Sequence, residues 1–65
     1  MNLIINGEEH QVEVSTLEEV ISYFELDPQL VVTEVDGNII ERSNWSVTEL
    51  KDGMKIELVQ FVGGG

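Results

Sequence analysis

A single stretch of the chain repeats its apolar residues with the period of an α-helix. Its apolar residues share one helical face and are Leu17, Val20, Ile21 and Phe24. Ser15 and Thr16 stand three residues before Glu18 and Glu19, which is capping-box spacing, so the helix is predicted to begin there. Pro28 is predicted to close it, because the residue before a proline avoids the α conformation. One apolar stripe on one helix must be buried against other elements, and the rest of the chain must supply a sheet.

The remaining apolar segments have the residue types and alternation of β-strands. Strands are predicted at residues 3–5, 11–14, 30–35, 38–40 and 54–61. Asn6-Gly7 and Asp36-Gly37 separate two pairs of them, and such dipeptides adopt the positive φ angles of tight hairpin turns. Residues 41–49 are polar and irregular, and Trp45 and Val47 are expected to be their inward anchors.

This element order predicts an α+β fold with two layers. A mixed sheet of four to five strands carries one helix packed across it. Residues 1–61 are predicted to form this domain, and residues 62–65 a flexible C-terminal glycine tail, because glycine loses much backbone entropy on ordering and has no side chain to pack. No second domain or internal repeat is expected.

The charge of the chain excludes several classes of partner. Its 13 acidic and 3 basic residues give a net charge of −10, which disfavours nucleic acid and repels an anionic membrane surface. Basic protein surfaces are the expected partners. No apolar run is long enough to span a bilayer, and the expected location is the cytoplasm. The chain also has no cysteine, so any sulfur chemistry needs another group.

The C-terminal glycines supply such a group. Gly63, Gly64 and Gly65 have no side chains, so this segment is narrow enough to thread a channel and bring the Gly65 carboxylate to another protein's active site. Adenylation of a main-chain terminus requires that access. A flexible terminus without chemistry is the alternative interpretation of the same residues.

Several short motifs together resemble one family. They are Asp36-Gly37-Asn38-Ile39-Ile40 followed by Arg42 and Trp45, Leu50-Lys51-Asp52-Gly53 with Ile56-Glu57, and the closing Phe61-Val62-Gly63-Gly64-Gly65. Over essentially its whole length the chain resembles the sulfur carrier proteins of thiamine biosynthesis, the ThiS family of ubiquitin-like β-grasp proteins.

The resemblance implies a reaction on the tail. An E1-like adenylating enzyme, using ATP and Mg, would activate the carboxylate of Gly65, and sulfur from a persulfide donor such as a cysteine desulfurase would convert it to a thiocarboxylate. Thiazole synthase would receive the sulfur. Val62, Gly63 and Gly64 would thread the partner's active site. The chain would be a protein cosubstrate and not an enzyme, with no catalytic residue and no cofactor or metal of its own.

A docking surface is predicted beside the tail. Val59 and Phe61 fall on the opposite face of the last strand from Ile56 and Leu58, and we expect them to dock partner enzymes. The alternative is that Phe61 merely seals the sheet edge. His10, with no second histidine in the chain, is expected at a solvated strand position and not in a metal site.

Other functions remain open from the sequence. Molybdopterin-type sulfur carriers and ubiquitin-like modifiers share the fold and the Gly-Gly end that the resemblance implies. From a different class, a β-grasp interaction module without tail chemistry would bind partners through its sheet and tolerate changes at Gly64 and Gly65.

Overall fold

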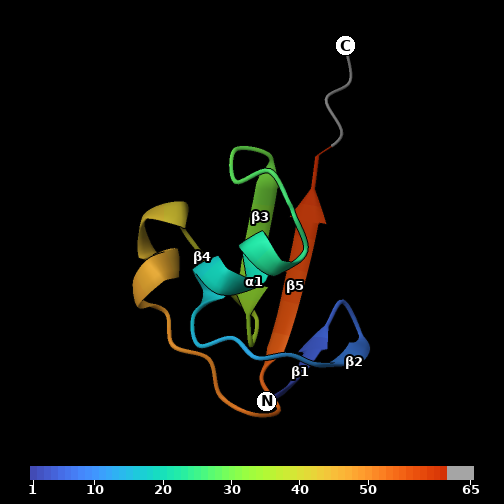
Figure 1. Ribbon diagram of the computed structural model, residues 1–65. Coiled ribbons are helices and arrows are strands. Elements are labelled where there is room, and N and C mark those ends of the chain that lie inside the picture. Colours follow the sequence, from blue (N-terminus) through green and yellow to red (C-terminus); the bar gives the residue numbers. More distant parts are fainter. Residues whose placement is uncertain (62–65) are drawn as a thin grey trace.

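A computed structural model describes residues 1–61; the predicted tail, 62–65, lies outside the described residues. Five strands form one sheet in the order β2-β1-β5-β3-β4 (Figure 1). The elements are β1 (Asn2–Ile5), β2 (Glu8–Gln11), α1 (Leu17–Tyr23), β3 (Val31–Val35), β4 (Asn38–Ile40), the 3-10 helix η1 (Arg42–Val47) and β5 (Lys55–Gln60).

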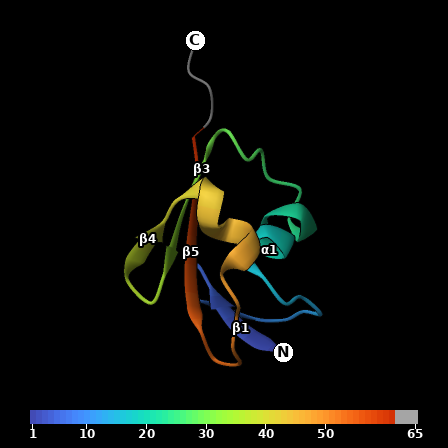
Figure 2. The same ribbon diagram turned by 90° about the vertical axis from the view of Figure 1, so that its left-hand side faces the viewer.

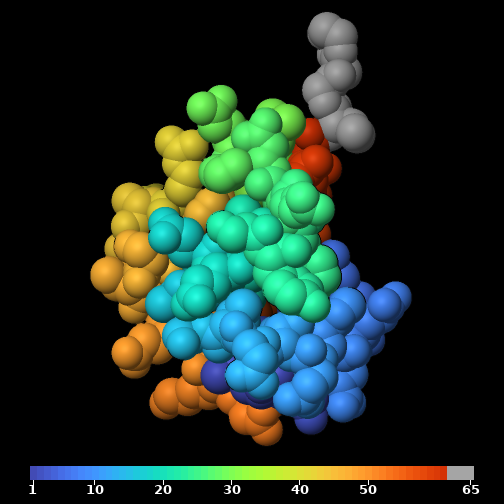
Figure 3. Space-filling view, viewed as in Figure 1, coloured from blue at the N-terminus to red at the C-terminus, as the bar shows by residue number. Residues whose placement is uncertain are grey.

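The sheet is mixed, as predicted. β1 runs parallel to β5, whereas the β1–β2, β3–β4 and β3–β5 pairs are antiparallel. α1 and η1 lie on one side of the sheet (Figure 2). In the space-filling view from the α1 side, atoms of α1 and of the segment after it cover most of β5, which emerges near its C-terminal end (Figure 3). The predicted two-layer α+β fold is confirmed.

The start of α1 follows the predicted capping box. The Thr16 hydroxyl oxygen accepts from the Glu19 N–H (3.4 Å), and the Glu19 carboxylate accepts from the N–H groups of Ser15 and Thr16 (3.1 Å each). These bonds satisfy N–H groups that a helix start leaves without intrahelical partners. The capping box marks where the helix begins, and the Leu17 N–H, which donates to the Thr48 carbonyl (3.1 Å), also holds this end.

The sequence predicted that Pro28 closes α1, and this prediction is wrong. Glu25 adopts a positive φ of 55°, and its N–H donates to the Ser22 carbonyl while the Leu26 N–H donates to the Ile21 carbonyl. This pattern is a Schellman motif, which ends a helix by satisfying its last carbonyls. The helix thus stops at Tyr23, and Leu26 packs against the core.

The second strand lies earlier than the predicted range 11–14. Asn6 (φ 51°) and Gly7 (φ 81°) form a two-residue turn with both φ angles positive, and this turn pairs Ile5 directly with Glu8. The strand must therefore begin at Glu8. The alternation that suggested residues 11–14 reports real burial, since Val12 and Val14 are buried, but in the connection to α1.

Trp45 anchors η1 in the core as predicted, but Val47 does not. Trp45 is 3% exposed, and its Nε1–H lies 3.0 Å from the buried Thr33 hydroxyl oxygen and 3.2 Å from the Ile40 carbonyl. Val47 is 72% exposed. A 3-10 helix has about three residues per turn, so residues two apart point in different directions. The predicted inward position of Val47 is wrong for that reason.

Candidate functional site

β5 is the central strand of the sheet and the last element before the predicted tail (Figure 1). The segment between α1 and β3 holds its last residues. The Phe61 N–H donates to the Leu30 carbonyl (2.8 Å), and the Gln60 side-chain oxygen accepts from the Asp27 N–H (3.1 Å). The position at which the tail leaves the domain is therefore fixed by hydrogen bonds. The predicted site residues Val62, Gly63, Gly64 and Gly65 lie outside the described residues.

An apolar patch lies beside this point, on the sheet face that α1 does not cover. We call it the outward patch and define it as Val32, Val59 and Phe61. Val59 pairs directly with Val32. The side chain of Val32 is 38% exposed, that of Val59 54% and that of Phe61 58%. Ile56 and Leu58 point to the core instead. The predicted exposure of Val59 and Phe61 is confirmed, and their docking role stays a prediction.

Two carboxylates face each other next to the outward patch. Glu34 on β3 and Glu57 on β5 are directly opposite in the register, one pair along from Thr33 and Leu58. Side chains at such positions are neighbours on one face, and like charges there are destabilising. The sheet thus keeps two opposed carboxylates on the same face as the outward patch, with Lys55 of β5 close to both.

Replacing Glu34 by glutamine is expected to stabilise the free protein. Removing one charge of the directly opposed pair should raise the free energy of unfolding by about 0.5 kcal/mol. Urea unfolding followed by circular dichroism at low salt measures the change. Glu13→Gln is the matched control, because it removes the same charge from an exposed position outside the strands. Equal gains in the two variants would show that only net charge matters and that the pairing does not.

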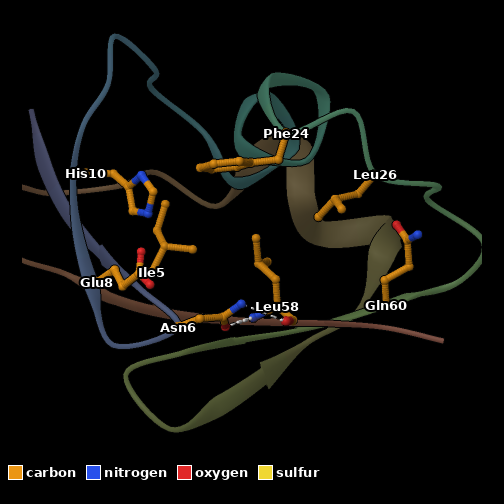
Figure 4. A pocket seen from close by; sticks show the side chains of 8 residues that line it. All are labelled: Ile5, Asn6, Glu8, His10, Phe24, Leu26, Leu58 and Gln60. Atoms are coloured by element: carbon orange, nitrogen blue, oxygen red, sulfur yellow. Dashed lines mark hydrogen bonds between the residues drawn. The ribbon is translucent and has the colours of Figure 1, made fainter. Parts of the chain in front are cut away.

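His10 lies on a strand, as predicted, but its side chain is not fully solvated. It is half-buried, and its ring meets the Phe24 ring edge-on at a centroid distance of 5.3 Å. Both rings line a hollow between the β1–β2 hairpin and the end of α1 (Figure 4). Within residues 1–61, no three His, Cys, Asp or Glu side chains are grouped to hold a metal ion.

Similarity to known proteins assigns the chain to a family. The model of the ThiS family matches residues 3–65. The chain belongs to the ThiS family. Among solved structures, the ThiS thiamine biosynthesis protein of Geobacter metallireducens is 32% identical, with a TM-score of 0.84 and 100% coverage of both chains. The predicted β-grasp fold is confirmed by that structural likeness.

Two kinds of curated relative are similar in sequence. The sulfur carrier protein ThiS of Bacillus subtilis is 31% identical over 97% of this chain and 98% of its own length. The thiazole synthase of Paramagnetospirillum magneticum is 36% identical over 100% of this chain but only 20% of its own length. This ThiS-family chain thus spans a full carrier and about a fifth of a thiazole synthase.

Sequence reasoning missed a long-range contact between two residues that line the hollow. The Asn6 side chain bonds to the main chain of Leu58, although the Asn6-Gly7 pair signalled only a turn. No local signal could have found this contact, because the two residues lie far apart in the sequence.

In the described part of this ThiS-family chain, no helix is both long and apolar enough to cross a membrane.

Proposed function

We propose that this chain is a cytoplasmic sulfur carrier of thiamine biosynthesis, with the sulfur held on the carboxyl group of Gly65. The observation that carries the proposal is its end-to-end similarity to the sulfur carrier protein ThiS of B. subtilis, which covers 97% of this chain and 98% of that one. Similarity over the full length of a small carrier supports the same task more strongly than a shared fold does, because one fold hosts many functions.

The chemistry starts from a carboxylate, which is a poor electrophile. An E1-like enzyme with Mg and ATP joins the Gly65 carboxylate to AMP and releases pyrophosphate. A persulfide, formed by a donor such as a cysteine desulfurase, then attacks the acyl carbon and AMP leaves. A thiol cleaves the resulting acyl disulfide, which leaves the thiocarboxylate on Gly65 and a disulfide on the partner. The chain has no cysteine, so every thiol in these steps belongs to a partner.

The described fold suits a cosubstrate. β5 is hydrogen-bonded on both sides as far as Leu58, and Phe61 is still held by Leu30. A strand held in this way fixes where the tail begins, and Val62, Gly63 and Gly64 would supply a narrow chain for a partner's active site. The reaction groups come from the partner enzymes, and this chain supplies the acyl group.

Thiazole synthase is the proposed acceptor of the sulfur. Proteins named thiazole synthase contain a segment similar to all of this chain within a much longer polypeptide, of which the match covers 20%. Joining two activities in one chain raises the effective concentration of each for the other. The separate chain described here would meet the synthase as a second protein.

The outward patch is the proposed docking surface for the activating enzyme. Phe61→Ala removes an exposed ring next to the tail and is expected to weaken binding about tenfold or more, as aromatic anchors of interfaces do. Calorimetric titration of the host's E1-like enzyme measures the affinity. Val47→Ala is the control, since Val47 is also exposed but lies on η1. Unchanged affinity of the Phe61 variant would favour the simple edge-sealing role.

Intact mass spectrometry tests the proposed function. The protein is incubated with Mg-ATP, the host's E1-like enzyme, a persulfide donor and a thiol. A mass increase that matches replacement of one oxygen by sulfur, absent without ATP, is the expected result. If an enzyme set that modifies another carrier leaves this chain unmodified, the carrier proposal fails and an interaction module becomes the better reading.

A further inference from the structure

The pairing of β1 with β5 is extended at its end by the side chain of Asn6. The Asn6 N–H donates to the Ile56 carbonyl (2.9 Å), which is the last main-chain bond between the two segments. One step further, the Asn6 side-chain oxygen accepts from the Leu58 N–H (2.8 Å) and its amide nitrogen donates to the Leu58 carbonyl (3.1 Å). A side-chain amide thus takes the place of a strand residue for one more step (Figure 4).

The next residue on that edge has no such partner. The Lys55 carbonyl accepts from the Asp36 N–H, and the Phe61 N–H donates to the Leu30 carbonyl, both on the β3 side of the sheet. The odd-numbered residues of β5 therefore bond toward β3 and the even-numbered ones toward β1. The N–H and C=O of Gln60 therefore point to the β1 side, beyond the hairpin. The β1–β5 pairing ends before Gln60, so within residues 1–61 no paired strand lies opposite these two groups on the β1 side. β5 ends there in a short open edge.

A hollow lies directly beside this open edge. Its volume is about 310 Å³, and its lining residues are Ile5, Asn6, Glu8, His10, Phe24, Leu26, Leu58 and Gln60. In Figure 4 the four apolar side chains surround the hollow and those of Asn6 and Gln60 stand at its border. The Gln60 side chain is on the α1 side of the sheet, in alternation with Ile56 and Leu58, so the hollow and the Gln60 side chain share one face.

We propose that an extended segment of thiazole synthase pairs with β5 at Gln60 and places an apolar side chain in this hollow. The residue directly opposite Gln60 in an added strand points to the same face as Gln60, which is the face of the hollow. Strand addition of this kind takes its affinity from main-chain bonds and its specificity from pockets for alternate side chains. This inference rests on the proposed function.

Charge defines the partner segment further. The hollow is lined by one carboxylate, Glu8, and by no lysine or arginine, in a chain whose net charge is −10. A lysine or arginine two residues from the inserted apolar residue would point to the same face and complement that carboxylate. Gln60 also stands just before the predicted tail, so a synthase strand bound there would hold the start of the tail against the synthase.

A pair of variants tests the hollow. Leu26→Glu places a charge on its apolar wall and is expected to weaken binding to the host's thiazole synthase about tenfold or more. Val47→Glu adds the same charge at an exposed position on η1 and is expected to bind like the wild type. Equal affinities for the two variants would overturn the inference. Circular dichroism of both variants checks that they are folded.

Amide hydrogen exchange of the wild type tests the open edge without any substitution. In the free protein the Gln60 N–H should exchange faster than the Phe61 N–H, which is bonded to Leu30. With thiazole synthase bound, exchange at Gln60 should slow at least tenfold, because its N–H gains a main-chain partner. Unchanged exchange at Gln60 in a saturated complex would overturn the inference, as would protection that appears only with the activating enzyme.

The outcomes separate this inference from the proposed function. Leu26→Glu should still gain the thiocarboxylate, because the hollow lies on the opposite face from the outward patch. If the wild type gains the thiocarboxylate and binds the synthase, but Gln60 stays unprotected and Leu26→Glu binds equally well, only the inference fails. If the wild type gains no thiocarboxylate, the carrier proposal fails whatever the exchange data show.

Discussion

One alanine added after Gly65 is expected to abolish thiocarboxylate formation. The activating enzyme must bring the terminal carboxylate to the α-phosphorus atom of ATP. An added residue moves that carboxylate past the reacting position by about 3.5 Å. A misplacement of about 1 Å can already cost about a hundredfold in rate. Intact mass after a timed incubation with Mg-ATP, the E1-like enzyme and a persulfide donor measures the loss.

The added alanine should leave the folded domain unchanged. The contacts that hold the end of β5 involve Gln60, Phe61, Leu30 and Asp27, and none of them is altered. Equal urea midpoints for the wild type and the extended chain are therefore the control. If the extended chain gains sulfur as fast as the wild type, the reaction does not require the carboxylate to stand at the position of Gly65. An interaction module, by contrast, would gain no sulfur and would bind its partners equally well with and without the extra residue.

Trp45→Ala is expected to leave a large fraction of the molecules unfolded. Replacing a buried tryptophan by alanine costs about 3–5 kcal/mol, through lost burial and an unfilled cavity. A domain of this size has a total stability of only about 3–10 kcal/mol, at about 0.05–0.15 kcal/mol per residue. The variant should therefore show a much lower urea midpoint, or no folded baseline, in far-UV circular dichroism.

The hydrogen bonds of Trp45 give this prediction a graded control. Its Nε1–H reaches both the Thr33 hydroxyl and the Ile40 carbonyl, and the Thr33 hydroxyl also donates to Ile40 (2.9 Å). Trp45→Phe keeps most of the buried ring and removes the donor, so its cost should be clearly smaller, about 1–3 kcal/mol. Val47→Ala, at an exposed site on the same helix, should cost little. A Trp45→Ala variant as stable as Val47→Ala would show that η1 does not anchor the core.

Local features of the sequence determined several elements by themselves. The capping box around Thr16 and Glu19 fixed the start of α1 through contacts three residues apart. The Asn6-Gly7 turn fixed the first hairpin, and alternation in β5 separated its buried residues from Val59. The motifs of the whole chain indicated the family and hence the fold. Each of these depends on neighbours in the chain, or on a pattern that persists whatever the partner element is.

Tertiary structure decided the features that need distant partners. Val12 and Val14 alternate like a strand, but the hairpin register left them in a connection that is buried under other elements. Glu34 and Glu57 became opposed only when β3 paired with β5. Asn6 reaches Leu58, 52 residues along the chain, and the contacts of β5 with the first hairpin end there, before Gln60. Hydrogen bonding and burial between segments far apart in sequence depend on the packed sheet, whereas helix caps and tight turns are determined by the residues that form them.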